Sequence, residues 1–272
     1  MNETDPGLQT AGTPAVRPGE LSREAYIYLG AGAAVLLQLA NPGVGWGVSE
    51  HSTTLRRPLD RLRTTMIYIY ALNLGSEQER RMVAQLVNRA HGPVHSERYS
   101  AFDPQLQLWV AATLYRSGAQ LAEIFNGPLG DADAEILYQH AAIYGTALQV
   151  RPDMWPPNRA AFEAYWTRSL ESFSVDDQVR SYAQALLRGG AAPWWTRVLL
   201  PLQSFTTRGL LPPAMREAFG LPWSRFDQLR WDRFLRYAPM LYRWLPRWVR
   251  HAPASYFLRD MRRRIAAHQP PF

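Results

Sequence analysis

Apolar residues recur every three or four positions along most of this chain, which is the spacing of one face of an α-helix. The alternation of apolar and polar residues that is typical of half-buried strands is not found in any long stretch. The pattern therefore predicts an all-α protein. Helices are predicted for 21–39, 52–74, 76–91, 103–125, 131–148, 158–170, 175–188, 193–207, 212–219, 224–241 and 254–267.

Residues that favour helix starts support several of these boundaries. Ser22 is the expected N-cap of the first helix, because its hydroxyl can accept a hydrogen bond from a free backbone N–H. Ser76 with Glu79 three residues later is the signature of a capping box. Asp103 followed by Pro104 is typical of a cap and a first helical residue.

Glycine and proline mark the expected breaks between helices. Asn41-Pro42-Gly43 predicts that the first helix stops, and we expect the glycine-rich segment 41–47 to be a compact turn. Gly92-Pro93 ends the helix 76–91, because proline cannot supply the backbone N–H that the next turn needs. A proline-rich loop is expected at 151–157.

The length of 272 residues and the hydrophobic share of 47% fit a single globular multi-helix domain, expected at residues 21–268. Residues 1–20 are polar and rich in glycine, proline and threonine, so we expect a disordered N-terminal tail there. The longest apolar run, 26–40, is shorter than the ~20 residues that cross a bilayer. No signal-peptide pattern is visible, and we expect a cytoplasmic protein.

The net charge of +7 is carried by arginine, since the chain contains no lysine. A basic protein invites a nucleic-acid interpretation. The arginines are scattered over many predicted helices, however, and net charge alone indicates no specific partner. We predict no nucleic-acid binding, and no oligomeric state is predicted.

Arginines and aromatic residues are interleaved near the C-terminus, in 230–237 and 242–250. Such a segment can lie on a membrane surface. It can also form a closing pair of helices whose arginine stems cover apolar surface. The second interpretation is favoured, and membrane contact is the alternative.

The lack of cysteine excludes disulfides, thiolate nucleophiles, iron–sulfur clusters and cysteine-ligated haem. Any metal must then be held by His, Asp, Glu or Tyr. His91 ends the amphipathic helix 76–91 and is the candidate ligand for a metal or a haem iron. The structural alternative is a core histidine.

The other histidines offer weaker candidates. His91 and His95 are four residues apart, a spacing that gives two zinc ligands on a continuous helix. Pro93 lies between them and no Glu follows the first His, so this pair is not favoured. Structural or surface roles are expected for His51, His140, His251 and His268.

Cationic and hydroxyl side chains cluster on the helix before His91. Arg57 and Arg61 are one helical turn apart and can form an anion clamp. A hydroxyl of Thr64 or Thr65 can hydrogen-bond the ligand that Arg61 binds. The alternative is a solvated basic face with two core threonines.

Several short segments together carry a resemblance to a known family. They include Arg61-Leu-Arg-Thr64, His91-Gly-Pro-Val94 and Tyr99-Ser-Ala-Phe-Asp-Pro104. The further segments are 36–42, 47–52, 75, 108–110, 155–157, 165–166, 210–216 and 219–221. In this order and spacing the chain resembles DUF2236, the rubber-oxygenase or mpaB-type oxygenase catalytic domain, which includes latex clearing proteins.

The resemblance implies an all-helical domain, globin-like in general character, that encloses a haem-b pocket. It implies that His91 is the proximal iron ligand. It also implies that Arg61 and either Thr64 or Thr65 line the distal side.

The leading hypothesis is therefore a haem-b-dependent oxidoreductase that oxygenates, oxidatively cleaves or dehydrogenates its substrate. His91 would bind the metal, Arg57 and Arg61 would contact the cofactor, and Arg61, Thr64 and Thr65 would be catalytic. We expect a small apolar or aromatic substrate, such as an isoprenoid or a secondary metabolite, together with dioxygen or peroxide. A helical protein that binds haem or an apolar ligand without turnover is the alternative, since a helical fold alone does not specify chemistry.

Overall fold

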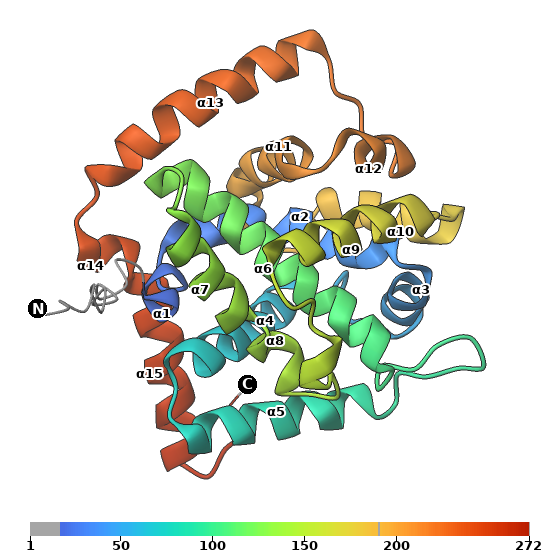
Figure 1. Cartoon of the computed structure of the whole chain (residues 1–272), viewed down its shortest axis with the longest axis vertical. Helices are drawn as coiled ribbons and strands as arrows, with labels where there is room; N and C mark the ends of the chain where they lie inside the picture. Colours follow the sequence, from blue (N-terminus) through green and yellow to red (C-terminus); the bar gives the residue numbers. More distant parts are fainter. Residues whose placement is uncertain (1–16, 190, 272) are drawn as a thin grey trace, which may run out of the picture.

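The computed structural model describes residues 17–189 and 191–271. Within these ranges the regular structure is helical, and one isolated antiparallel bridge joins His95 to Ser100. The predicted all-α class is confirmed (Figure 1). Most of the expected N-terminal tail, residues 1–16, lies outside the described residues.

The α-helices are α1 (Pro18–Leu21), α2 (Ala31–Ala40), α3 (Pro42–His51), α4 (Pro58–Leu74), α5 (Glu77–His91), α6 (Pro104–Asn126), α7 (Asp131–Ala141), α8 (Ile143–Thr146), α9 (Arg159–Ser172), α10 (Asp177–Leu187), α11 (Leu200–Leu210), α12 (Pro213–Ala218), α13 (Arg225–Arg243), α14 (Arg247–Arg250) and α15 (Ala252–Ala266). Three 3₁₀ helices accompany them: η1 (Ala25–Gly30), η2 (Pro152–Met154) and η3 (Trp194–Leu199).

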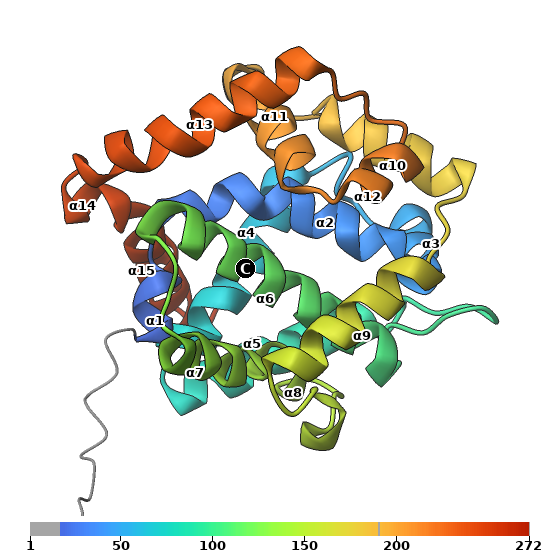
Figure 2. The same ribbon diagram turned by 45° about the horizontal axis from the view of Figure 1, so that its top comes forward.

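Helices α2 and α6 form the centre of the larger hydrophobic core (Figures 1 and 2). The indole N–H of Trp109 donates to the backbone carbonyl of Leu37 at 2.8 Å and ties the two helices together. The same indole stacks on Trp166 of α9, with ring centroids 4.9 Å apart. Stacked aromatic pairs add to the stabilisation that burial itself provides.

A second core joins α4 to α5 and α15. Met66 and Ile67 of α4, Val83 of α5 and Met261 of α15 are all buried in it. Arg63 of α4 also forms an ion pair with Asp260 of α15, whose side chain is buried. These contacts fix the rotation of α4 about its own axis.

Two expectations about the first fifty residues were wrong. The segment 41–47 is the start of α3 and not a turn, because the Asn41 side chain caps it by accepting from the backbone N–H of Gly43 and Val44. Proline at position 42 is compatible with the first helical residue. Ser22 does not cap a helix: its hydroxyl donates to the carbonyl of Gly19, and the expected long helix is divided into η1 and α2.

Other predicted helix boundaries differ from the observed ones by less than two helical turns. The expected helix 52–74 begins only at Pro58, and the expected helix 131–148 is divided at Ala142. The capping box of Ser76 and Glu79 is confirmed, and so is the Asp103 cap before Pro104. Among the described residues, no single helix is long and apolar enough to cross a membrane; the stretches 25–40 and 42–51 pass that test only jointly, across a bend of 110°.

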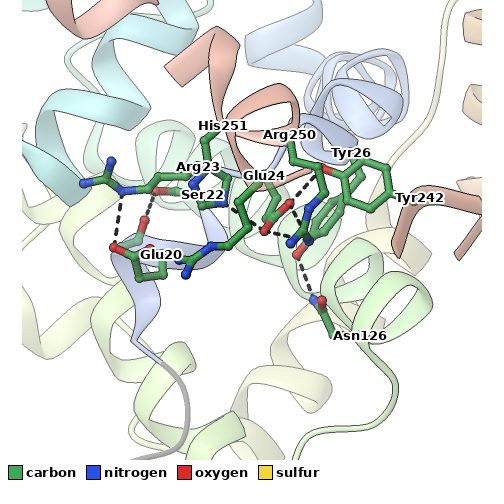
Figure 3. A network of polar contacts seen from close by, with 11 residues as sticks. Glu20, Ser22, Arg23, Glu24, Tyr26, Asn126, Tyr242, Arg250 and His251 are labelled. Carbon is green, nitrogen blue, oxygen red and sulfur yellow. Dashed lines mark hydrogen bonds and ion pairs between the residues drawn. The ribbon is translucent and has the colours of Figure 1, made fainter. Parts of the chain in front are cut away.

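A buried carboxylate connects the two ends of the domain (Figure 3). Glu24 precedes η1 and accepts a hydrogen bond from the hydroxyl of Tyr242 at 2.8 Å. Arg250 and His251 contact the same carboxylate at 3.2 and 3.1 Å. A buried charge requires such partners, so this cluster holds the C-terminal helices against η1.

Candidate functional site

The candidate site begins with the position of His91 at the end of α5. Its helix starts at the capping box, and Glu79 of that box accepts from Arg262 of α15 at 2.7 Å. The imidazole is half-buried and lies edge-on to Phe102, with ring centroids 6.4 Å apart. Contacts at Glu79 and at His91 therefore hold α5 near both of its ends.

The two nitrogens of the His91 ring have different surroundings. Nδ1 is buried and has no hydrogen-bond partner within the described part of the chain. Nε2 also has no partner there, but it retains accessible surface. Burial lowers the pKa of His91, and the charge of Arg61 lowers it further. The ring is therefore neutral near pH 7, which is the form of imidazole that binds metal ions.

Arg61 and Arg63 lie on nearly opposite faces of α4. Successive helical residues are 100° apart, so residues two positions apart point in nearly opposite directions. Arg63 is bound to Asp260, and Arg61 lies instead near His91 and Tyr182. Arg61 is accessible to solvent, yet loss of hydration lowers the pKa of its guanidinium.

Tyr182 of α10 is a member of the site that the sequence analysis missed. Its ring is buried, its hydroxyl has no hydrogen-bond partner among the described residues, and it lies within electrostatic range of Arg61. Asp176 positions α10 by capping it and by accepting from the indole of Trp46 on α3. Tyr182 follows Val179 at helical spacing, so in the sequence it looks like any other core residue.

Thr64 and Thr65 lie three and four residues after Arg61, which places both near its side of α4. Their hydroxyls donate to the carbonyls of Asp60 and Arg61, at 2.9 and 3.0 Å. Each hydroxyl oxygen can still accept a hydrogen bond from a ligand. Thr65 is the more exposed of the two. The choice between the two threonines stays a prediction.

Arg57 lies apart from this group. Its side chain is 72% exposed and pairs with Asp60 at 2.6 Å, within the first turn of α4. The structure therefore brings Arg61 and His91 together and leaves Arg57 at the surface. Its expected contact with a cofactor stays a prediction.

The remaining histidines take structural or surface positions. His95 is exposed and lies beyond the end of α5, so it does not share a helix face with His91. His140 is hydrogen-bonded to Asn73 at 3.0 Å, and His251 to Glu24. Over residues 17–189 and 191–271, no three His, Cys, Asp or Glu side chains gather at metal-binding spacing.

The chain matches the model of one protein family over residues 20–251, described as ER-bound oxygenase mpaB/B′/rubber oxygenase, catalytic domain. The chain belongs to this family. The resemblance inferred from Arg61-Leu-Arg-Thr64 and His91-Gly-Pro-Val94 is thereby confirmed. The domain is of the oxygenase type.

Two curated relatives are also similar to the chain. They are uncharacterized proteins of Mycobacterium bovis and Mycobacterium tuberculosis, each 39% identical over 240 residues. The aligned region covers 85% of this chain and 94% of each relative. No solved structure is significantly similar to the chain.

Proposed function

We propose that the protein is a haem-b-dependent oxygenase in which His91 is the iron ligand. The observation that carries the proposal is the state of this imidazole: it is neutral, half-buried, and has an accessible Nε2 with no hydrogen bond to the described residues. One histidine would be a sufficient protein ligand for haem, whose macrocycle supplies the other donors. Such a site requires no cluster of acidic side chains.

The surroundings of His91 also fit this cofactor. Arg61 provides a partly desolvated cation that can pair with a propionate or with an anionic ligand, and such charge-assisted contacts are the stronger ones. Phe102 provides an aromatic edge against the imidazole. Metal-bound histidines normally donate their second ring N–H to an acceptor. The buried Nδ1 of His91 has no acceptor among the described residues, so this nitrogen does not add to the fit.

When bound, haem supplies the redox chemistry, and the protein supplies orientation and electrostatics. In this proposal Arg61 holds negative charge beside the cofactor. Thr64 or Thr65 accepts a hydrogen bond on the same side of α4. The free hydroxyl of Tyr182 is a second donor within range of Arg61. The substrate would be a small apolar or aromatic molecule that reacts with dioxygen or peroxide.

The test is the absorption spectrum of the purified protein, with haem b quantified as the pyridine haemochrome. We expect near-stoichiometric haem in the natural protein and less than a tenth of it in His91→Ala. His95→Ala is the matched control, because His95 is exposed and four residues further along. Haem content that is unchanged in His91→Ala, or a protein that does not bind added haemin, would contradict the proposal.

A further inference from the structure

Helix α13 has apolar residues on two opposite faces. The inner face contains Trp231, which is buried, and Phe234, which is partly buried against the core. On the opposite face, Phe226 and Met240 are 64% and 58% exposed, and Trp244, which directly follows the helix, is 86% exposed. A surface helix of a globular protein normally needs only one apolar stripe, because its other side faces water. The outer stripe therefore indicates an external partner.

The outer stripe continues onto α14, and η3 exposes apolar side chains as well. Trp194 and Val198 of η3 are 82% and 78% exposed, and Trp248 of α14 is 76% exposed. Leu202, at the start of α11, lines a groove together with Arg230 and Arg233 of α13, which places the start of α11 beside α13. We call Phe226, Met240, Trp244 and Trp248 the outer apolar face.

The position of α13 leaves this face uncovered. In Figures 1 and 2 the helix runs along the outer edge of the molecule, and no other helix lies over its far side. Its 19 residues correspond to a length of about 28 Å. An exposed apolar area on this scale marks an interaction site in soluble proteins.

The outer apolar face is flanked by cations. Helix α13 contains five arginines and two aspartates. Within the described residues, Arg233, Arg236 and Arg243 form no ion pair, and neither does Arg197 of η3. The two aspartates are engaged locally: Asp227 in the capping box with Ser224, and Asp232 with the amide of Gln228. The positive charge on this side is therefore available to a partner.

We propose that the outer apolar face docks on the surface of a bilayer that contains anionic lipids. Tryptophan and tyrosine favour the headgroup region, where their apolar rings and polar N–H or O–H groups are both accommodated. Arginines beside them are attracted to the negative lipid surface. Helices that combine these two features lie in the plane of the interface.

A second copy of the chain is a poorer occupant. A two-fold contact places the same patch on both sides of the interface. The arginine-rich patch of one copy would then face the arginine-rich patch of the other, with no acidic residue of α13 free to separate them. An anionic lipid surface avoids this repulsion and offers the opposite charge.

The experiment is co-sedimentation of the full chain with vesicles, either of phosphatidylcholine alone or of an equal mixture with phosphatidylglycerol. We expect binding to the anionic vesicles that weakens as salt is raised, because exposed charges are screened. The fluorescence of the exposed tryptophans should shift to shorter wavelength on binding. The measurement does not involve haem, so His91→Ala should bind vesicles as the natural protein does.

Two double substitutions separate the contribution of the exposed aromatic rings to vesicle binding from that of the arginine charges. Trp244→Ser/Trp248→Ser removes exposed rings only, so the fold should be retained while vesicle affinity falls by roughly tenfold or more. Arg233→Gln/Arg243→Gln should lower affinity by about 25-fold, as expected for two arginines near an anionic surface. The matched controls are Tyr256→Ser, a 62% exposed ring on α15, and Arg81→Gln/Arg168→Gln, which removes the same charge elsewhere.

Three outcomes would overturn the proposal. The first is no binding to anionic vesicles at low salt. The second is binding that falls equally in the control and test variants. The third is a concentration-dependent dimer that Trp244→Ser/Trp248→Ser abolishes, without vesicle binding, which would assign the face to a second copy. Circular dichroism and thermal unfolding of each variant establish that it is folded.

Discussion

The guanidinium of Arg61 lies close enough to the imidazole of His91 for its charge to lower the pKa of that ring. The two residues come from different helices, and their proximity depends on the rotation of α4, which the ion pair of Arg63 with Asp260 helps to fix. A catalytic domain of the oxygenase type thus places one cation beside one neutral imidazole.

Arg61→Ala should raise the pKa of His91 towards its ordinary value of 6.5, because the repelling charge is gone and water reaches the ring. The pKa is measured by NMR titration of the imidazole in haem-free protein. Thr65→Ala, one turn away without a charge, is the control. An unchanged His91 pKa in Arg61→Ala would show that the two side chains do not interact.

The same variant separates an enzyme from a carrier. If the proposed function holds, Arg61→Ala should retain haem, because His91 is intact, and should lose most of its oxygen consumption with an accepted substrate. The expected loss is about 10²-fold or more, as for the removal of one preorganised charged donor. A natural protein that binds haem stoichiometrically and consumes no oxygen with any apolar substrate would favour the non-catalytic alternative.

The stability of the haem-free protein should fall when the pH falls below about 6.5. His91 and His140 both have pKa values lowered mainly by burial, from an unfolded value of 6.5. Between that value and the lowered ones, the unfolded chain binds protons that the folded chain does not, so protonation favours unfolding. Urea denaturation at several pH values measures this, and His91→Gln should reduce the dependence. Equal stability on both sides of pH 6.5 would be inconsistent with buried neutral rings.

Asp260→Asn should destabilise the domain by about 3–5 kcal/mol, because it leaves the guanidinium of Arg63 without its buried counter-charge. Urea unfolding gives the change in free energy. Asp153→Asn is the control, since Asp153 is exposed in its ion pair with Arg151 and should affect stability little. A loss of stability as small as that of the control would show that α15 does not hold α4 through this pair.

Two glycine-to-alanine substitutions should have opposite effects. At Gly209 an added Cβ would lie 2.6 Å from Cδ2 of Trp231, so α13 would be forced away from α11, at a cost of about 1–3 kcal/mol. At Gly118, within α6, nothing lies within 4 Å of such a Cβ. Alanine there should stabilise the helix by about 0.5–1 kcal/mol. Thermal unfolding of both variants checks the pair, and a stabilised Gly209→Ala would refute the close approach.

Local signals were enough to predict parts of the fold from the sequence. The capping box of Ser76 and Glu79 acts within four residues, and it fixed the start of α5 correctly. The prediction for the segment 41–47 was wrong because its glycines were interpreted as a turn. A single side chain, Asn41, caps the segment as the start of a helix. Tertiary packing also covers its glycines: a Cβ on Gly45 would meet Val179 at 2.9 Å.

The candidate site was predictable only in part. Arg61 and His91 could be named because their spacing and residue types match a family motif. Tyr182 could not, since a tyrosine at core spacing reveals neither an unpaired hydroxyl nor an approach to Arg61 from 121 residues along the chain. The interleaved arginines and aromatics near the C-terminus predicted an amphipathic pair of helices. They did not reveal that α13 is apolar on both its buried and its exposed face. That property depends on which face of the helix packs against the core, and the sequence does not show this.

The carboxylate of Glu24 has a consequence for the synthesis of the protein. One of its partners, His251, follows 227 residues later in the chain. At a translation rate of about 5–20 residues per second, the ribosome delivers that partner roughly 10–45 seconds after Glu24. Until then the acid cannot be buried at its final position, and η1 lacks its cover from the C-terminal helices. The domain therefore completes its folding only after the segment with His251 has been synthesised.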